Sequence, residues 1–190
     1  MAEASKDSNA KRMNRQFEEI IAGLQLSDLQ TRFLRDRWLD QLLWFENKAH
    51  ANQRRYYALR LVTIVGGLIV PALVSLNVRG DNVAEALAWI TFSLSLVVAI
   101  AAAVDGFFKF GERWRSFRRI TELLKAHGWQ YFELSGPYRA PDHAGAFTTF
   151  AAQVEGVIQE DLTAFIAQAA QARAAQAERQ AGQTPGDATQ

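Results

Sequence analysis

The amino-acid sequence predicts an all-α membrane protein, in which a hairpin of two transmembrane helices continues into a cytoplasmic helical bundle. Three observations lead to this fold class. Two long blocks of the chain contain no charged residue, the flanking segments repeat apolar residues at helical spacing, and no segment alternates apolar and polar residues as a half-buried strand does. The chain has 190 residues, the size of one domain.

The two uncharged blocks are long enough to cross a bilayer. Residues 61–78 read LVTIVGGLIVPALVSLNV, and residues 86–104 read ALAWITFSLSLVVAIAAAV. At about 1.5 Å per residue each helix is roughly 27–29 Å long, close to the hydrocarbon core of about 30 Å. The alternative is a buried hairpin in a soluble domain, but two such blocks in tandem are unusual in so small a chain. We therefore predict transmembrane helices over both ranges.

The charges beside the two blocks predict their orientation. Four Lys or Arg residues lie within residues 45–60 and five within residues 105–120, whereas the short turn predicted over residues 79–85 carries only Arg79. Because Lys and Arg accumulate on the cytoplasmic side of a membrane, both termini are expected in the cytoplasm. The same basic residues are expected to contact anionic lipids of the cytoplasmic leaflet.

Helical spacing extends the prediction into the cytoplasm, where residues 15–60 and 105–166 are expected to form helices. A capping-box pattern at Ser27 predicts the start of one of them. Nothing between Asp28 and Pro71 breaks a helix outright, so this helix is expected to enter the membrane without interruption. The second span is expected to continue likewise into the cytoplasm.

Apolar residues on the cytoplasmic continuation of the second span form a seam that can pack on the cytoplasmic part of the first long helix. They step by three and four and are Phe107, Phe110, Trp114, Phe117, Thr121 and Leu124. The polar residues 1–14 and the Ala/Gln-rich residues 167–190 are predicted to be disordered.

Composition and motifs argue against several function classes. A net charge of +1 speaks against a nucleic-acid partner bound through bulk charge. The chain has no cysteine, its three histidines are scattered, and no phosphate-binding, dinucleotide-binding or hydrolase motif occurs. We therefore predict no enzyme activity, no catalytic or metal-binding residue and no cofactor.

Small residues form two stripes at i, i+4 spacing within the uncharged blocks. They are Thr63, Gly67, Pro71 and Ser75 in the first block and Thr91, Ser95, Ala99 and Ala103 in the second. One interpretation is helix packing, the common use of such stripes, because small residues let backbones approach closely. The other is that one stripe lines a water-filled path in an oligomer, since two helices alone cannot enclose a pore.

Charged residues mark the cytoplasmic boundary of the predicted spans. Asp105 ends the second block, and an acidic residue at membrane depth is a candidate functional residue. We expect it to form an ion pair with Arg60 or Lys109. The alternative is a ring of Asp105 carboxylates that selects ions at the mouth of an oligomeric pore.

Several aromatic and basic positions are similar to a known family. They are the runs at residues 44–49 and 55–60, followed by Trp114, Phe117 and Arg118. This pattern resembles the bacterial SLATT superfamily, more narrowly its uncharacterised two-transmembrane (DUF4231-like) branch. The resemblance implies a multi-pass protein of the bacterial inner membrane and a pore-forming effector of bacterial defence. It implies no catalytic residue.

These observations lead to two hypotheses of function. The first is a homo-oligomeric channel or pore gated from its cytoplasmic helices, whose seams supply the subunit contacts while polar Asn52 and Thr121 set their register. The second is a non-conducting membrane scaffold whose helical bundle docks a cytoplasmic protein partner.

Overall fold

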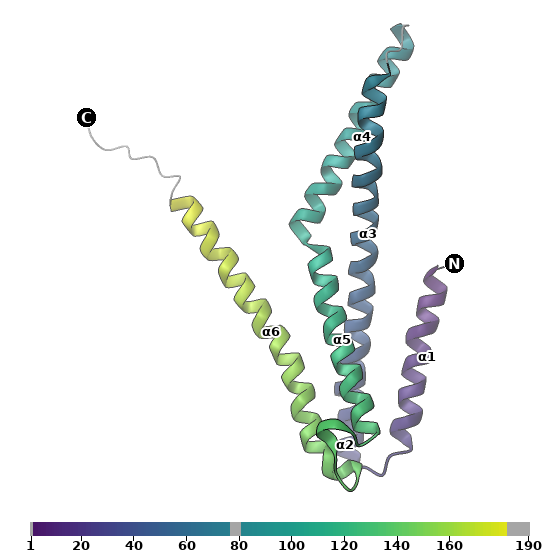
Figure 1. Cartoon of the computed structure of the whole chain (residues 1–190), viewed down its shortest axis with the longest axis vertical. Coiled ribbons are helices and arrows are strands. Elements are labelled where there is room, and N and C mark those ends of the chain that lie inside the picture. The colour runs from purple at the N-terminus through teal and green to yellow at the C-terminus, as the bar shows by residue number, and fades with distance from the viewer. Residues whose placement is uncertain (1, 77–80, 182–190) are drawn as a thin grey trace, which may run out of the picture. The chain divides into compact units, whose positions relative to one another are not determined.

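The computed structural model describes residues 2–76 and 81–181 and is shown in Figure 1. The described residues form helices and no strand, which confirms the all-α prediction. In chain order the elements are α1 (Ala2–Ala22), α2 (Asp28–Arg32), the π-helix η1 (Phe33–Leu39), α3 (Asp40–Ser75), α4 (Asp81–Phe108), α5 (Phe110–Phe132), the 3₁₀ turn η2 (Gly136–Tyr138) and α6 (His143–Ala181). The side chains of residues 2–10, of Asp81 and of many residues in 161–181 lie outside the description.

The chain divides into two compact units. Unit 1 comprises residues 1–14 and 41–121, and unit 2 comprises residues 15–40 and 122–190. Unit 1 therefore contains most of α3, all of α4 and the first half of α5. Unit 2 contains the aromatic residues of η1, the end of α5, η2 and α6.

The helix that begins after Ser27 continues to Ser75, as the sequence predicts. Ser27 forms the expected capping box, in which its Oγ accepts from the Gln30 N–H at 3.4 Å and Gln30 Oε1 accepts from the Ser27 N–H at 3.0 Å. The helix passes through the π-helical segment η1 and continues as α3. It ends four residues after Pro71, whose missing N–H leaves the Gly67 carbonyl without its usual helical donor.

The second apolar helix does not continue into the cytoplasm without interruption, so that prediction was wrong. Helix α4 ends at Phe108, Lys109 has φ 50°, and α5 begins at Phe110. Figure 1 shows the change of direction between α4 and α5. Gly106 and Gly111 weaken the helix on both sides of the break, and α5 packs on Tyr56 of α3 directly after it.

Both ends of the chain and the predicted turn contain more helix than expected. Helix α1 starts at Ala2 and α6 continues to Ala181, because their Ala, Glu, Gln, Lys and Arg residues favour helix. Within the predicted turn at residues 79–85, positions 81–85 form the first turns of α4. Residues 79–80 and 182–190 lie outside the described residues.

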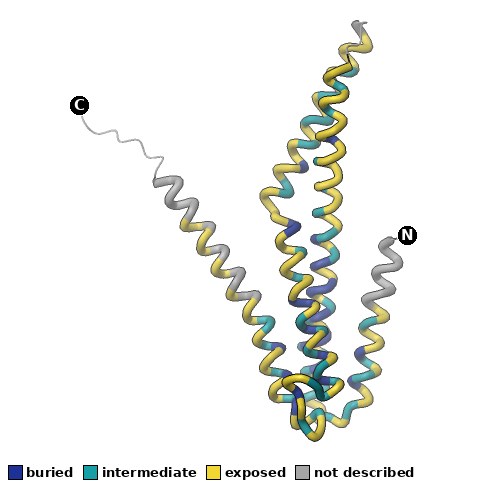
Figure 2. Tube along the Cα trace, in the orientation of Figure 1, coloured by how far each residue is buried: buried dark blue, intermediate teal, exposed yellow. Residues whose placement is uncertain are grey.

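Two helices are long and apolar enough to cross a membrane, namely the continuous helix 28–75 and helix α4. Only 6% of the residues in the most apolar window of each are buried within the chain. Figure 2 shows these segments coloured mostly as exposed. A core helix of a soluble protein would be mostly buried, so this exposure argues against the soluble alternative.

Unit 2 has a core made largely of aromatic rings. Trp38 of η1 is completely buried and contacts the rings of Phe17, Phe132 and Phe150 at centroid distances of 5.1–6.0 Å. Its indole Nε1 donates a hydrogen bond to the Leu124 carbonyl at 3.1 Å. Gly128 makes room for this ring, because a Cβ at that position would collide with it.

Candidate functional site

The two apolar helices meet at a glycine that the predicted stripes do not contain. Gly66 on α3 is buried, and a Cβ at this position would collide with the Val98 side chain on α4. Gly67, the stripe residue, has no atom within 4 Å of the position of a Cβ. The helix contact therefore runs one residue beside the predicted stripe.

The stripe residues divide between the helix contact and the exposed surface. Thr63, Thr91 and Ser95 are half-buried. The exposed members are Gly67, Pro71, Ser75, Ala99 and Ala103. An i, i+4 stripe turns by about 40° around a helix at each step, whereas a packing seam alternates steps of three and four. The two stripes therefore do not pack on each other along their whole length.

The hydroxyl groups of the stripes donate to their own helices. Thr91 Oγ1 donates to the Leu87 carbonyl at 2.8 Å, and Ser95 Oγ donates to the Thr91 carbonyl at 2.8 Å. Thr63 and Ser75 bond in the same way to Leu59 and Pro71. Each donor is thereby satisfied without water, which lowers the free-energy cost of placing it in an apolar environment.

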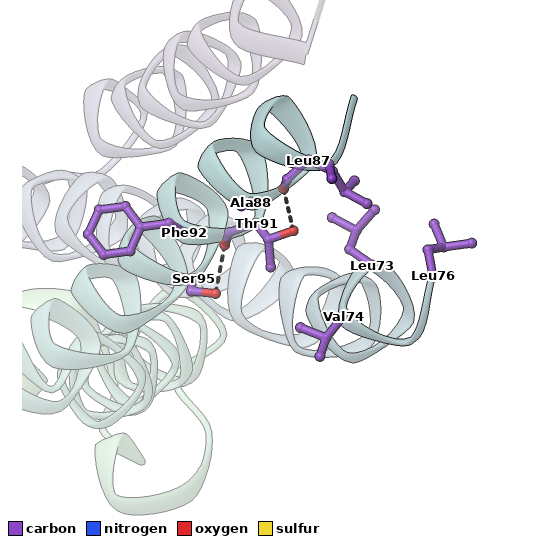
Figure 3. Close-up of a pocket in the computed structure, with 9 residues that line it drawn as sticks. Leu73, Val74, Leu76, Leu87, Ala88, Thr91, Phe92 and Ser95 are labelled. Carbon is purple, nitrogen blue, oxygen red and sulfur yellow. Dashed lines mark hydrogen bonds between the residues drawn. The ribbon is translucent and has the colours of Figure 1, made fainter. Parts of the chain in front are cut away.

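A groove of about 440 Å³ lies between the end of α3 and the start of α4 (Figure 3). Its walls include Leu73, Leu87 and Phe92, and Thr91 and Ser95 are its hydroxyl-bearing residues. Because both hydroxyl protons are committed to helix carbonyls, the walls offer apolar surface and hydroxyl lone pairs but no free donor.

The predicted ion pair of Asp105 is absent among the described residues. Asp105 is half-buried and Arg60 is exposed, while Lys109 Nζ lies 3.6 Å from Glu112 Oε2. The physical reason is the break at Lys109, which redirects this side chain along α5. Asp105 instead contributes its backbone carbonyl, which accepts from the Lys109 N–H at 2.9 Å.

After the break at Lys109, α5 packs on α3 within unit 1 through aromatic rings and through a second glycine that lies close to a side chain of the other helix. A Cβ on Gly111 would lie 2.8 Å from Tyr56 Cε2, and the Trp114 ring lies 6.4 Å from that of Tyr56. The guanidinium of Arg55 lies 5.8 Å from the centre of the Phe110 ring. The seam of the sequence analysis begins at Phe110, since Phe107 is 81% exposed.

A buried carboxylate lies farther along the same helix pair. Glu46 on α3 is 8% exposed, and its Oε1 accepts from His50 Nε2 at 2.9 Å and from Arg118 Nη1 at 3.2 Å. Asn52 and Thr121, the two polar residues at apolar positions, are also buried. Each donates to a carbonyl of its own helix, that of Lys48 and that of Phe117 respectively. That Asn52 and Thr121 set the register between subunits stays a prediction.

In unit 2, a bidentate ion pair joins η1 to α6. Arg37 Nε and Nη2 each lie 2.7 Å from an oxygen of Glu155. The hydrogen bonds from Arg37 lower the pKa of Glu155, and those same bonds raise the pKa of Arg37. The periodicity of the sequence did not indicate this pair, because its members are 118 positions apart.

Tyrosines and histidines around η2 complete the unit 2 core. Tyr138 OH shares a hydrogen bond of 2.6 Å with His127 Nδ1, and Tyr131 OH donates to the His143 carbonyl at 3.0 Å. Burial raises the pKa of each tyrosine to about 12 and lowers that of His127. Both phenols therefore stay protonated, and the neutral form of His127 is favoured.

Comparison with known proteins gives one finding. The family described as "Protein of unknown function (DUF4231)" matches residues 40–146, which is more than half of the chain. The matched region starts with α3 and ends within the first turn of α6, so it includes both apolar helices. No curated protein and no solved structure matches the chain.

Proposed function

The chain belongs to the DUF4231 family of proteins of unknown function, and we therefore propose its function from its own residues. We propose that it is an integral membrane protein that forms a homo-oligomeric channel gated from its cytoplasmic helices. The exposed apolar surface of α3 and α4 carries the membrane part of this proposal. Leu68 and Val74 on α3 are each at least 70% exposed, and Trp89 and Phe92 on α4 are more than 60% exposed. In water this surface would be strongly unfavourable at about 25 cal/mol per Å².

The exposed small residues support self-association of the spans. Gly67 on α3 and Ala99 and Ala103 on α4 leave room for a second helix at close range. In lipid, where apolar burial does not drive association, close backbone approach at small residues is a main source of helix–helix attraction. Two spans cannot enclose a pore, so a conducting path requires several copies of the chain.

The proposal places both termini in the cytoplasm of a bacterial cell and the chain in the inner membrane. The charge asymmetry around the apolar helices supports this orientation. Anionic lipids are the expected partners of the exposed Arg60, Arg113 and Arg115 near the boundary. The similarity to the SLATT superfamily supports a role as a pore-forming effector in bacterial defence.

The experiment is ion flux through liposomes that contain the purified chain. Ser95 lines the groove on α4, whereas Ser93 is exposed on another face of the same helix. We expect Ser95→Leu to abolish flux and the matched control Ser93→Leu to retain it. Equal flux from both variants would exclude Ser95 from the conducting path.

The second candidate function is a non-conducting scaffold that binds a cytoplasmic protein. The mostly apolar walls of the groove favour it, because Thr91 and Ser95 commit their hydroxyl protons to helix carbonyls and few other polar groups remain to line a water-filled path. This function predicts no flux from the wild type, from Ser95→Leu, or from the wild type after residues 122–190 have been removed by proteolysis of the reconstituted protein. Flux from any of the three contradicts it.

A further inference from the structure

One residue joins the second apolar helix to the cytoplasmic helix that follows it. Lys109 has φ 50°, in the left-handed region that L-residues rarely adopt. Its N–H donates to the Asp105 carbonyl at 2.9 Å, which is the bond of an αL helix cap. Its own carbonyl accepts from the N–H groups of Glu112 and Arg113, both at 3.1 Å. Lys109 thus ends α4 and begins α5.

Lysine suits neither of these positions. Glycine is the usual residue in a left-handed helix cap, and Ser, Thr, Asp or Asn is usual where a helix begins. Lysine is a good helix former, and a continuous helix through this position would restore the i→i−4 bonding pattern. The lysine at position 109 therefore favours a straight helix, whereas the structure has a bent one, with Gly106 and Gly111 on either side of it.

Contacts of α5 with α3 stabilise the bend. Gly111 lies against the Tyr56 ring, and Phe110 and Trp114 contact the aromatic and basic residues of the same stretch of α3. On the α4 side of Lys109, Phe107 is exposed and the space beside Gly106 is open. Immediately next to Lys109, α5 is thus packed on α3, whereas the contact of α4 with α3 lies farther from the junction, at Val98 and Gly66.

We propose that Lys109 is a two-state hinge, bent while α5 packs on Tyr56 of α3 and straight when that contact is released. Release of α5 would then change the direction of the second span, which gives the cytoplasmic helices a route to act on the membrane region. This inference rests on the membrane insertion proposed above but not on conduction. A chain that conducts no ions can still contain the hinge.

The experiment measures distances between nitroxide labels on the full chain in lipid nanodiscs. The chain contains no cysteine, so pairs of labelled cysteines can be introduced without background. One pair, at Ile100 and Arg115, spans the hinge; the reference pair, at Asn47 and Val62, lies within α3. All four residues are exposed, and both pairs are 15 residues apart. In a straight helix each pair is separated by about 22 Å along the axis.

The variants move the hinge in opposite directions. Lys109→Gly removes the penalty on left-handed φ, and Lys109→Val increases it, because a β-branched residue disfavours that region. We expect a wild-type population shorter than about 22 Å across the hinge. Lys109→Gly should enrich this population, and Lys109→Val should move it toward the straight-helix value. The distance of the reference pair should be the same in the wild type and in both Lys109 variants. The matched changes Ala102→Gly and Ala102→Val should leave both distances unchanged.

Two results would overturn the proposal that Lys109 is a hinge. One is a wild-type distribution already centred on the straight-helix value, and the other is a single distribution shared by the wild type and both Lys109 variants. Tyr56→Ala provides an independent variant that leaves Lys109 intact. It should shift the distance across the hinge in the same direction as Lys109→Val, and an unchanged distance would show that Tyr56 does not hold the bend.

Discussion

The core of unit 2 and the contact between the apolar helices of unit 1 are built in opposite ways. In unit 2, the bulky Trp38, Tyr131 and Phe150 rings are completely buried and make defined edge-to-face or stacked contacts. In unit 1, α3 and α4 meet where Gly66 accepts the side chain of Val98, and only 6% of the residues in the most apolar stretch of each helix are buried.

This difference indicates where the stability of each region originates. Burial of large rings gives unit 2 a core that is formed within the chain. The helix hairpin has little internal burial, so its stability depends on what surrounds it, namely lipid or further copies of the chain in our proposal. Substitutions should therefore have their largest effect in unit 2 and smaller effects at the hairpin and the surface.

The largest expected effect is that of Trp38→Ala. This change removes a completely buried ring and its hydrogen bond to the Leu124 carbonyl. Truncation of a buried Trp lowers the free energy of unfolding by about 3–5 kcal/mol. Denaturant titration followed by near-UV circular dichroism measures this change.

Trp44→Ala is the matched control, because Trp44 is 46% exposed. It should lower the free energy of unfolding by clearly less than Trp38→Ala does. If the two substitutions have equal effects, burial is not what distinguishes the aromatic core, and the contrast between the two regions fails.

A smaller effect is expected at the helix contact, where two adjacent glycines can be compared. A Cβ on Gly66 would collide with Val98, so Gly66→Ala should destabilise the hairpin by on the order of 1 kcal/mol after its gain in helix propensity. Gly67→Ala meets open space and should be neutral or stabilising by up to about 1 kcal/mol. Thermal unfolding in detergent measures both.

The double variant Gly66→Ala/Val98→Ala sharpens this comparison. Removing the two methyl groups of Val98 should recover most of the stability that Gly66→Ala loses, because the collision involves only these groups. No recovery would mean that Gly66 is needed for a reason other than its contact with Val98.

Much of the fold could be predicted because its signals are local. The uncharged blocks, the capping box at Ser27 and the helical spacing after it depend on neighbouring residues, and the structure contains the corresponding helices. The break at Lys109 could not be predicted in this way. It depends on packing of α5 against Tyr56, which is more than 50 positions away in the sequence.

The candidate site was less predictable for the same reason. Three glycines, Gly66, Gly111 and Gly128, each accept a side chain from another helix, yet nothing in the sequence distinguishes them from Gly67. The stripes of small residues located the correct helices but not the contacting faces. The contact of two helices depends on their crossing geometry, which a single-helix pattern does not contain.

The smallest effect is expected at the ion pair between Arg37 and Glu155. Their side chains are 41% and 32% exposed, so solvent screens the pair and its contribution is at most about 1 kcal/mol. The folded pKa of Glu155 lies below its ordinary value of 4.5. The carboxylate therefore stabilises the folded state at neutral pH, and this contribution decreases as the pH falls below 4.5 through the folded pKa.

Glu155→Gln tests whether the Glu155 carboxylate stabilises the folded state at neutral pH and loses this effect in acid. At pH 7 the variant should unfold at lower denaturant concentration than the wild type, and the difference should shrink in acid and in high salt. The exposed Glu133 provides the control, because Glu133→Gln removes a carboxylate from the same unit without removing this ion pair. A difference between wild type and Glu155→Gln that stays constant from pH 7 into acid would mean that packing of the side chain, rather than its charge, connects η1 to α6.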